Sequence, residues 1–237
     1  MIAPLFRSKW LLVYSFIFLG DIIFTAQQLP VPRYITKPLL TVVLGMYVLS
    51  ESGFIKRSYL PFLLLALLFS FTGDVLLMFD QLNPAYFLGG LGSFWLAHLM
   101  YIAFFLKIRY SNPPVPLCKY PWIFLNAAFL IGFIIYLLPS LGDLKIPVII
   151  YAITICITVQ SSLHAFHHGW QKAGPYCVSG AVLFLLSDSL IALGKFVAPL
   201  PANGVLVMIT YGLAQWLLVT GAVMYFNPLL QKEHSSI

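Results

Sequence analysis

The chain has 237 residues, of which 61% are hydrophobic and only 8% are charged. An ordinary soluble domain is about 25% charged, so this composition excludes a water-soluble globule, a disordered chain and a nucleic-acid-binding module. Three cysteines are too few for a disulfide-stapled secreted domain, and the net charge of +6 needs another explanation.

Apolar runs long enough to cross a hydrocarbon core of about 30 Å recur along the whole chain. They predict an all-α fold, a polytopic membrane bundle of eight transmembrane helices. The expected spans cover residues 10–26, 34–50, 58–79, 85–107, 118–139, 146–164, 175–195 and 203–226. Because the connections are short, we expect residues 1–237 to form a single transmembrane domain. Asp21 interrupts the first run and no small-residue cleavage site follows it, so we expect this span to be retained.

The basic residues between the spans indicate an orientation, because eight spans place both termini on one side. That side holds nine basic residues: Arg7, Lys9, Lys56, Arg57, Lys107, Arg109, Lys119, Lys172 and Lys232. The other side holds four: Arg33, Lys37, Lys145 and Lys195. The positive-inside rule then predicts cytoplasmic termini, in the plasma (inner) membrane if the source is bacterial. Most of the net charge is therefore interpreted as a topology signal, with Lys195 reaching out to the interface.

Three acidic residues lie inside expected spans, namely Asp21, Asp74 and Asp188, and each follows a Gly or a Ser. Ionisable groups within a bilayer are costly unless they face the interior and find partners, so each one indicates a functional site. Helical rise places Asp74 and Asp188 roughly 8 and 10 Å below the non-cytoplasmic surface. These two carboxyls are therefore expected at one level, on spans whose separation by four suggests a weak four-plus-four repeat.

Further polar and aromatic residues are expected around these carboxyls. They are Lys37, which opens the second span with Pro38 beside it, the stripe Phe94, His98, Tyr101 and Phe105, and the pair Tyr211 and Gln215. A purely structural role remains open for each of them. Asp21 can be a solvated cap or a partner of Lys37, and His98 with Tyr101 can form a hydrogen-bonded pair.

A competing constellation is His164, His167 and His168, whose spacing on one helical face is typical of metal ligands. It lies at the cytoplasmic end of the sixth span, away from the aspartates, and interfacial histidines are usually solvated. No metal is therefore expected. Cys118, Cys156 and Cys177 form no CxxC pair and are expected to be free thiols.

Four segments resemble the motifs of the YhhN-like lysoplasmalogenase family, in the same order along the chain. They are Thr36-Lys-Pro-Leu, Thr72-Gly-Asp-Val-Leu-Leu, the stretch from Gly90 to Tyr101, and the stretch from Gly180 to Leu190. The resemblance implies hydrolysis of the vinyl-ether bond of lysoplasmalogens (1-alkenyl-glycerophosphoethanolamine or -choline) to a fatty aldehyde and a glycerophospho-base. It also implies an acidic pair, Asp74 and Asp188, surrounded by Lys37, His98, Tyr101, Ser189 and Gln215. Asp21 has no clear counterpart.

Vinyl-ether hydrolysis needs a carboxylic acid that protonates carbon and a carboxylate that stabilises the resulting cation, and two aspartates in one apolar cavity can divide these roles. Which aspartate takes which role is left open. We expect no cofactor, a lysophospholipid substrate among membrane lipids, no nucleic acid, and a tail cleft lined by Phe94, Phe105 and Phe184. The alternatives are a proton-coupled transporter, a metal-dependent membrane lipid hydrolase, and a protein with a structural or receptor role.

Overall fold

The computed structural model describes residues 8–111, 121–166, 172–198, 200–227 and 230. These residues form helices and connections, with no strand among them. The α-helices are α1 (Lys9–Ala26), α2 (Pro30–Ser50), α3 (Leu60–Met78), α4 (Pro84–Tyr110), α5 (Pro121–Leu137), α6 (Lys145–Ala165), α7 (Ala173–Phe196) and α8 (Asn203–Phe226). Two short 3₁₀ turns, Leu138–Ser140 and Gly142–Leu144, join α5 to α6. The prediction of an all-α fold is confirmed.

Each of the eight expected segments overlaps one of these helices, although residues 118–120 of the fifth lie outside the described part. The largest difference is at the start of α2. This helix begins at Pro30, four residues before the expected start, because proline is well accommodated in a first turn. Pro38 therefore lies inside the helix, and the expectation that Lys37 and Pro38 open it is wrong. The hydroxyl of Thr41 donates to the carbonyl oxygen of Pro38 over 2.8 Å.

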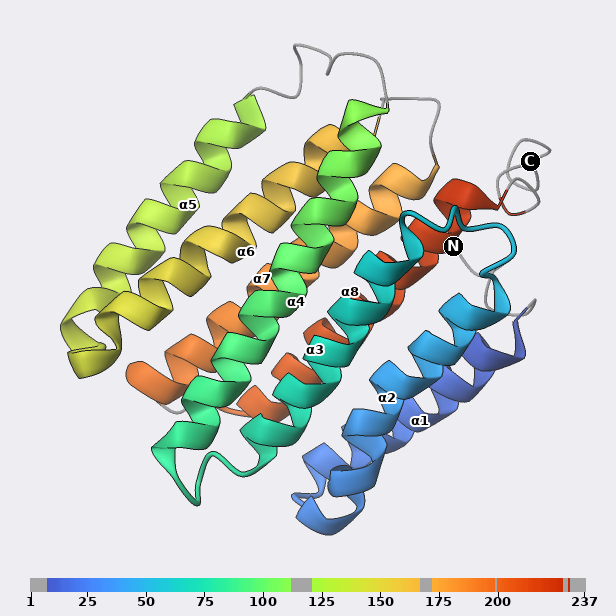
Figure 1. Cartoon of the computed structure of the whole chain (residues 1–237). Helices are drawn as coiled ribbons and strands as arrows, with labels where there is room; N and C mark the ends of the chain where they lie inside the picture. The colour runs from blue at the N-terminus through green and yellow to red at the C-terminus, as the bar shows by residue number, and fades with distance from the viewer. Residues whose placement is uncertain (1–7, 112–120, 167–171, 199, 228–229, 231–237) are drawn as a thin grey trace.

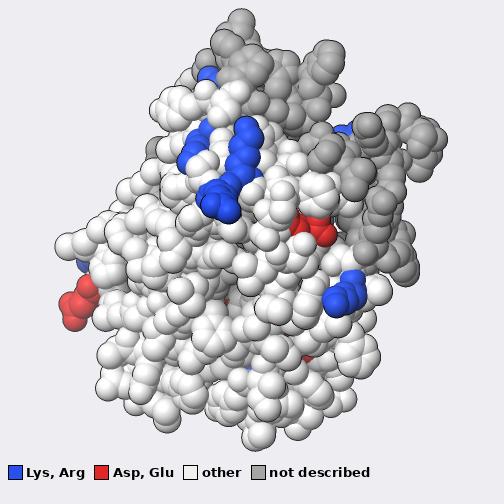
Figure 2. Space-filling view, turned by 45° about the vertical axis from the view of Figure 1, so that its right-hand side comes forward, with Lys and Arg blue, Asp and Glu red and all other residues white. Residues whose placement is uncertain are grey.

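Seven helices in the described parts of the chain are long and apolar enough to cross a membrane, which indicates an integral membrane protein. The helix that is not apolar enough by this measure is α2, which carries two cations and three prolines. On the face seen in Figure 2, Lys and Arg side chains gather toward one end of the molecule, and a broad, nearly uncharged belt lies below them. Such a belt is the surface that a helical bundle exposes to lipid tails.

Consecutive helices alternate in direction, so the start of α1 and the end of α8 lie at the same end of the bundle (Figure 1). The closest neighbours are the pairs α7 and α8, α3 and α4, and α1 and α2, while α8 also contacts α1 and α2. In contrast, α5 packs mainly on α6 at the edge of the bundle and buries only Leu137. The core therefore lies among the other seven helices.

Glycines allow the closest of these helix contacts. A Cβ atom at Gly180 of α7 would lie 2.8 Å from the backbone nitrogen of Leu218 and 2.9 Å from the carbonyl oxygen of Ala214, both on α8. A Cβ atom at Gly73 of α3 would lie 2.6 Å from the ring of Phe94 on α4. Small residues let helix backbones approach closely in membranes, and here they bring together the helices that carry the polar residues.

Candidate active site

A cavity of about 280 Å³ lies at the end of the bundle opposite the start of α1 and the end of α8. Its walls come from the first three turns of α2, α4 and α8, from the last three turns of α3 and α7, and from the turn after α3. The residues that line it are Arg33, Lys37, Asp74, Leu77, Asp80, Phe87, Phe94, Asp188, Ile191, Gly194, Lys195, Asn203, Gly204, Val207, Met208 and Tyr211. Both intramembrane aspartates of α3 and α7 therefore border one space.

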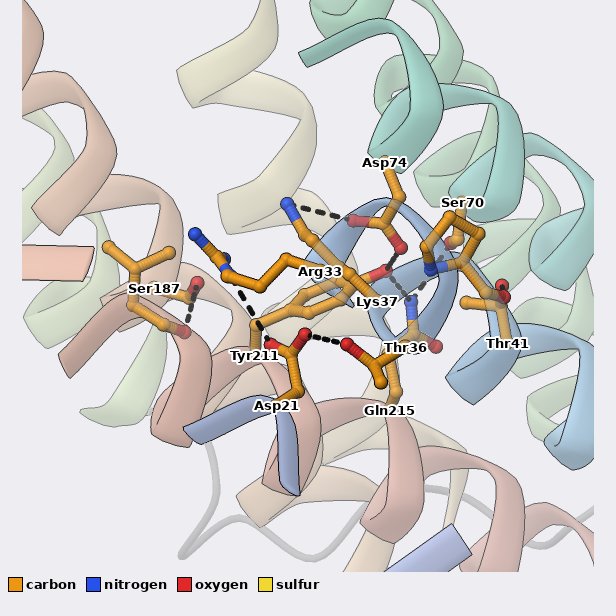
Figure 3. Close-up of polar contacts among 12 residues, drawn as sticks. Asp21, Arg33, Thr36, Lys37, Thr41, Ser70, Asp74, Ser187, Tyr211 and Gln215 are labelled. Carbon is orange, nitrogen blue, oxygen red and sulfur yellow. Dashed lines mark hydrogen bonds and ion pairs between the residues drawn. The ribbon is translucent and has the colours of Figure 1, made fainter. Parts of the chain in front are cut away.

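Asp74 is almost completely buried and has a cation and a phenol as partners. The ammonium of Lys37 lies 3.3 Å from its Oδ1, and the hydroxyl of Tyr211 donates to its Oδ2 over 2.6 Å (Figure 3). The same ammonium lies 5.9 Å from the centroid of the Tyr211 ring, which attracts a cation to its face. A buried carboxylate is stable only when it is paired and hydrogen-bonded, and Asp74 has both kinds of partner.

Behind Tyr211, a chain of hydrogen bonds extends toward the middle of the bundle. The Gln215 amide donates to the hydroxyl of Ser70 over 2.9 Å and to that of Tyr211 over 3.3 Å. The hydroxyl of Tyr101 donates to Gln215 Oε1 over 3.1 Å. This network joins α3, α4 and α8, so the orientation of Asp74 depends on three helices.

Asp188 borders the same cavity in a different setting. The Tyr151 hydroxyl of α6 donates a hydrogen bond to Asp188 Oδ2, and His98 Nε2 lies 3.8 Å from the same oxygen. His98 is fully buried between the rings of Tyr151 and Phe184. No Lys or Arg in the described residues pairs with Asp188.

Two narrow, mainly apolar crevices also reach Asp188. One, of about 40 Å³, lies between α5, α6 and α7 and is lined by residues such as Phe129, Ala152 and Ala192. The other, of about 50 Å³, lies among α3, α4, α6 and α7 and is lined by residues such as Leu91 and Ala192. Asp188 therefore stands where the polar cavity meets apolar space, whereas Asp74 lines neither crevice.

Comparison with known proteins shows the family. The sequence model of the YhhN family matches residues 32–222. The chain belongs to the YhhN family. This confirms the resemblance found in the sequence, and the match covers the helices from α2 to most of α8.

Curated relatives of this YhhN chain carry one name. A lysoplasmalogenase of Mycobacterium bovis is 32% identical over 158 residues, which are 66% of this chain and 58% of the relative. Human lysoplasmalogenase TMEM86B is 30% identical over 187 residues, which are 78% of this chain and 72% of the relative. Human lysoplasmalogenase TMEM86A is 28% identical over 173 residues, 69% of this chain and 65% of the relative. The chain thus matches less than two thirds of the mycobacterial relative's length, and no solved structure is a significant match.

Most of the residues expected in the candidate site lie together, but two structural roles that the sequence left open are not the ones that the structure shows. Asp21 is neither solvated nor a partner of Lys37, because it is fully buried, receives a hydrogen bond of 2.5 Å from Thr36, and lies 3.7 Å from Arg33 Nε. Tyr101 bonds Gln215 rather than His98. Ser189 and the expected tail cleft need a separate description.

Ser189 turns its hydroxyl back to its own helix, where it donates to the Leu185 carbonyl over 2.7 Å, and it lines only the smaller crevice beside α5. Phe105 and Phe184 are fully buried core residues and line none of the three spaces, so of the expected tail cleft only Phe94 borders the cavity. The Phe94 ring makes edge contacts with Phe184 and Tyr211, which fixes its place in the wall.

Sequence reasoning missed other residues of the candidate site. Arg33 and Lys195 were counted only as topology charges, yet both line the cavity, and Lys195 pairs with Asp80 over 2.7 Å. Nothing in the sequence marked Tyr151 or Asn203 as residues of the site, because a single Tyr in a span and an Asn at a helix start are both common. Arg33 could have been predicted from its position four residues before Lys37, because side chains at this spacing lie on the same face of a helix.

The predicted histidine constellation is only partly described. His164 contacts the side chain and carbonyl oxygen of Gln160, while His167 and His168 lie outside the described residues. No group of three or more His, Cys, Asp or Glu arranged to hold a metal occurs in the part of the chain that the structure describes. Cys156 and Cys177 are free and buried, and Cys118 also lies outside that part.

Proposed function

We propose that this protein is a lysoplasmalogenase, which hydrolyses the vinyl-ether bond of 1-alkenyl-glycerophosphoethanolamine or -choline to a fatty aldehyde and a glycerophospho-base. The single observation that carries the proposal is the pair of aspartates in one cavity, one with a lysine counter-ion and the other facing apolar crevices. The names of the curated relatives agree with it.

The surroundings of the two carboxyls favour a division of roles. Lys37 is the counter-ion of an ionised Asp74, and the Tyr211 hydroxyl orients it. Asp188 has no such lysine among the described contacts and borders the apolar crevices that can take the alkenyl chain. We therefore assign Asp188 as the proton donor and Asp74 as the carboxylate that stabilises positive charge and activates water.

The order of bond changes follows from these roles. Asp188 transfers its proton to C2 of the alkenyl chain, which leaves an oxocarbenium ion at C1 beside Asp74. Water adds to C1 and gives one proton to Asp74, forming a hemiacetal. Asp188 then takes the hemiacetal hydroxyl proton, and Asp74 returns its proton to the glycerol oxygen as the C1–O bond breaks. The products are the aldehyde and the glycerol alcohol, and both carboxyls return to their starting forms.

The apolar crevices support this orientation of the substrate. The carbon that receives the proton belongs to the alkenyl chain, so the proton donor must lie where the chain begins. Asp188 can lie at that place, since its side chain lines both crevices. A single-chain lipid can enter such crevices sideways from the surrounding leaflet, with its glycerol in the polar cavity.

We also infer that all eight helices cross the membrane, with both termini in the cytoplasm. The two cations that lower the hydropathy of α2 line the cavity, so they place no charge against lipid. Of the four basic residues expected on the non-cytoplasmic side, Arg33, Lys37 and Lys195 belong to the cavity, which strengthens the charge asymmetry. Matching aspartates on the tight pairs α3–α4 and α7–α8 support a four-plus-four repeat.

Aldehyde release by purified protein in detergent tests the function. The wild-type protein should release aldehyde from a lysoplasmenyl lipid and neither aldehyde nor fatty acid from a lysoacyl lipid. Asp188→Asn should lower aldehyde release at least 100-fold, because it keeps the shape of the side chain but cannot donate the proton to carbon. Asp143→Asn, at an exposed turn outside the cavity, is the matched control. Aldehyde release by Asp188→Asn near the wild-type rate would contradict the assignment.

A further inference from the structure

Three cations line the cavity, and two of them have a carboxylate partner in its wall. Lys37 lies 3.3 Å from Asp74, and Lys195 lies 2.7 Å from Asp80. Lys195 is also held over the ring of Phe87, 4.7 Å from its centroid. The charge of these two lysines is therefore neutralised inside the cavity, and the third cation, Arg33, differs from them.

The carboxylate partner of Arg33 lies behind the cavity wall. Asp21 is fully buried, does not line the cavity, and contacts Arg33 only at Nε, over 3.7 Å. Within the described part of the chain, the two terminal Nη nitrogens of Arg33 make no hydrogen bond. Figure 3 shows the Arg33 side chain running alongside Lys37, with a terminal nitrogen pointing away from Asp21. With 29% of its side chain exposed, Arg33 keeps this end accessible.

The guanidinium also lies beside a buried carboxylate. Thr36, one turn along α2, donates to Asp21 Oδ1 over 2.5 Å, which leaves Oδ2 for Arg33. The guanidinium faces Asp21 with its Nε at 3.7 Å, and its two Nη groups retain a fork of N–H donors for a ligand. Such a fork matches the paired oxygens of a phosphate or carboxylate.

We propose that Arg33 binds the phosphodiester of the substrate's headgroup, with its two Nη groups donating to two phosphate oxygens. This inference rests on the proposed function, because it takes the scissile ether to lie beside Asp74. In a lysoplasmalogen, five bonds separate the ether oxygen from phosphorus, a reach of about 6 Å. Arg33 lies one helical turn from Lys37, the partner of Asp74, and side chains at this spacing are about 6 Å apart. An ether at Asp74 therefore places the phosphate within reach of Arg33.

The decisive test compares a lysoplasmenyl-ethanolamine with a 1-O-alkenylglycerol, which has the same vinyl ether and no phosphate. Arg33→Lys keeps a charge for Asp21 but loses the fork. It should raise KM for the phospholipid about 10- to 100-fold, leave kcat nearly unchanged, and alter KM for the alkenylglycerol less than about twofold. The double variant Arg33→Gln with Asp21→Asn removes both charges of the pair and should show the same selectivity. Arg57→Gln, an exposed arginine at the opposite end of the bundle, should affect neither lipid.

Equal loss on both lipids would overturn the inference, because it would mean that Arg33 acts only through the structure of the site. Competition distinguishes a headgroup from a free anion. Glycerophosphoethanolamine should inhibit the wild-type protein and should inhibit Arg33→Lys much less, and inorganic phosphate that competes equally well would overturn the assignment to a lipid.

A binding measurement separates this inference from the proposed reaction. The probe is a saturated 1-O-alkyl-glycerophosphoethanolamine, which has no vinyl ether, with 1-O-alkylglycerol as its phosphate-free control. If wild-type protein binds the phospholipid at least tenfold more tightly and Arg33→Lys removes that difference, the phosphate site holds even when no aldehyde is released. If Arg33→Lys retains the difference, the phosphate site fails even when vinyl-ether hydrolysis is observed.

Discussion

The two aspartates share one cavity, yet their surroundings are opposite. Asp74 has an ammonium at 3.3 Å, a phenol at 2.6 Å and an amide network behind the phenol. Asp188 has a phenol, an imidazole at 3.8 Å and apolar crevices on two sides. Identical side chains in one cavity therefore meet different counter-ions and different local polarity, and both factors control the ionisation of a carboxyl.

The two regions also differ in what they hold together. The partners of Asp74 come from α2 and α8, and the network beyond them includes Ser70 of α3 and Tyr101 of α4. The described partners of Asp188 come from α4 and α6. We therefore expect changes at Asp74 to affect both stability and catalysis, and changes at Asp188 to affect mainly catalysis.

The largest expected effect is at Asp74, where one experiment can separate the contribution to stability from the contribution to catalysis. Asp74→Asn should lower aldehyde release at least 100-fold and also lower the melting temperature, because it leaves the Lys37 ammonium without its counter-ion. Adding Lys37→Met should restore much of the melting temperature and none of the activity. Thermal unfolding in detergent and aldehyde release, measured on the same preparations, check both parts.

Asp188→Asn is the comparison for that experiment. Its melting temperature should stay close to that of the wild-type protein while its activity is lost. A double variant of Asp74 and Lys37 with restored activity, or an Asp188 variant as unstable as Asp74→Asn, would show that the two regions do not differ in this way.

The two phenols should give the next largest effects. Tyr211→Phe removes the donor to Asp74 and one partner of Gln215, so we expect a loss of about 1 kcal/mol in stability and about tenfold in kcat. Tyr151→Phe removes a donor to Asp188 alone, and its effect on stability should be smaller. The kinetic constants and melting temperatures of the two variants, compared side by side, check this difference. Equal destabilisation by the two substitutions would contradict it.

A smaller effect is expected from separating the helices that carry the two regions. In Gly180→Ala, the new methyl would lie under 3 Å from two backbone atoms of α8, so α7 and α8 must move apart at a cost of about 1 to 3 kcal/mol. Because Asp188 and Tyr211 lie on these helices, kcat should fall severalfold. The matched control is Gly92→Ala, where a Cβ atom meets nothing within 4 Å. Similar melting temperatures for both variants would show that α7 and α8 tolerate the change.

The sequence allowed the helices to be predicted well, because each apolar run must satisfy its own backbone hydrogen bonds in lipid and therefore becomes a helix. It also indicated Asp74 and Asp188, since carboxyls are rare in such runs. Arg33 and Lys195 were harder to predict, because a cation near a helix end has the same appearance in sequence whether it meets phosphate headgroups or a cavity. The partners Tyr151 and Asn203 depend on which faces of distant helices meet, and the almost uniformly apolar helices carry little of that information.

Ser189 gives the smallest expected effect and tests the family resemblance at a single atom. The resemblance placed this residue around the acidic pair, but its hydroxyl donates to the Leu185 carbonyl of its own helix. Ser189→Ala should therefore leave kcat and KM for a lysoplasmenyl lipid within about twofold of wild type, since a hydroxyl bonded within its helix adds little to helix stability. Because the side chain borders the crevice beside α5, Ser189→Leu should instead disfavour long alkenyl chains. A tenfold loss of kcat in Ser189→Ala with both short and long chains would mean that the hydroxyl turns to the substrate during the reaction, and Ser189 would then belong with Asp188 in the catalytic group.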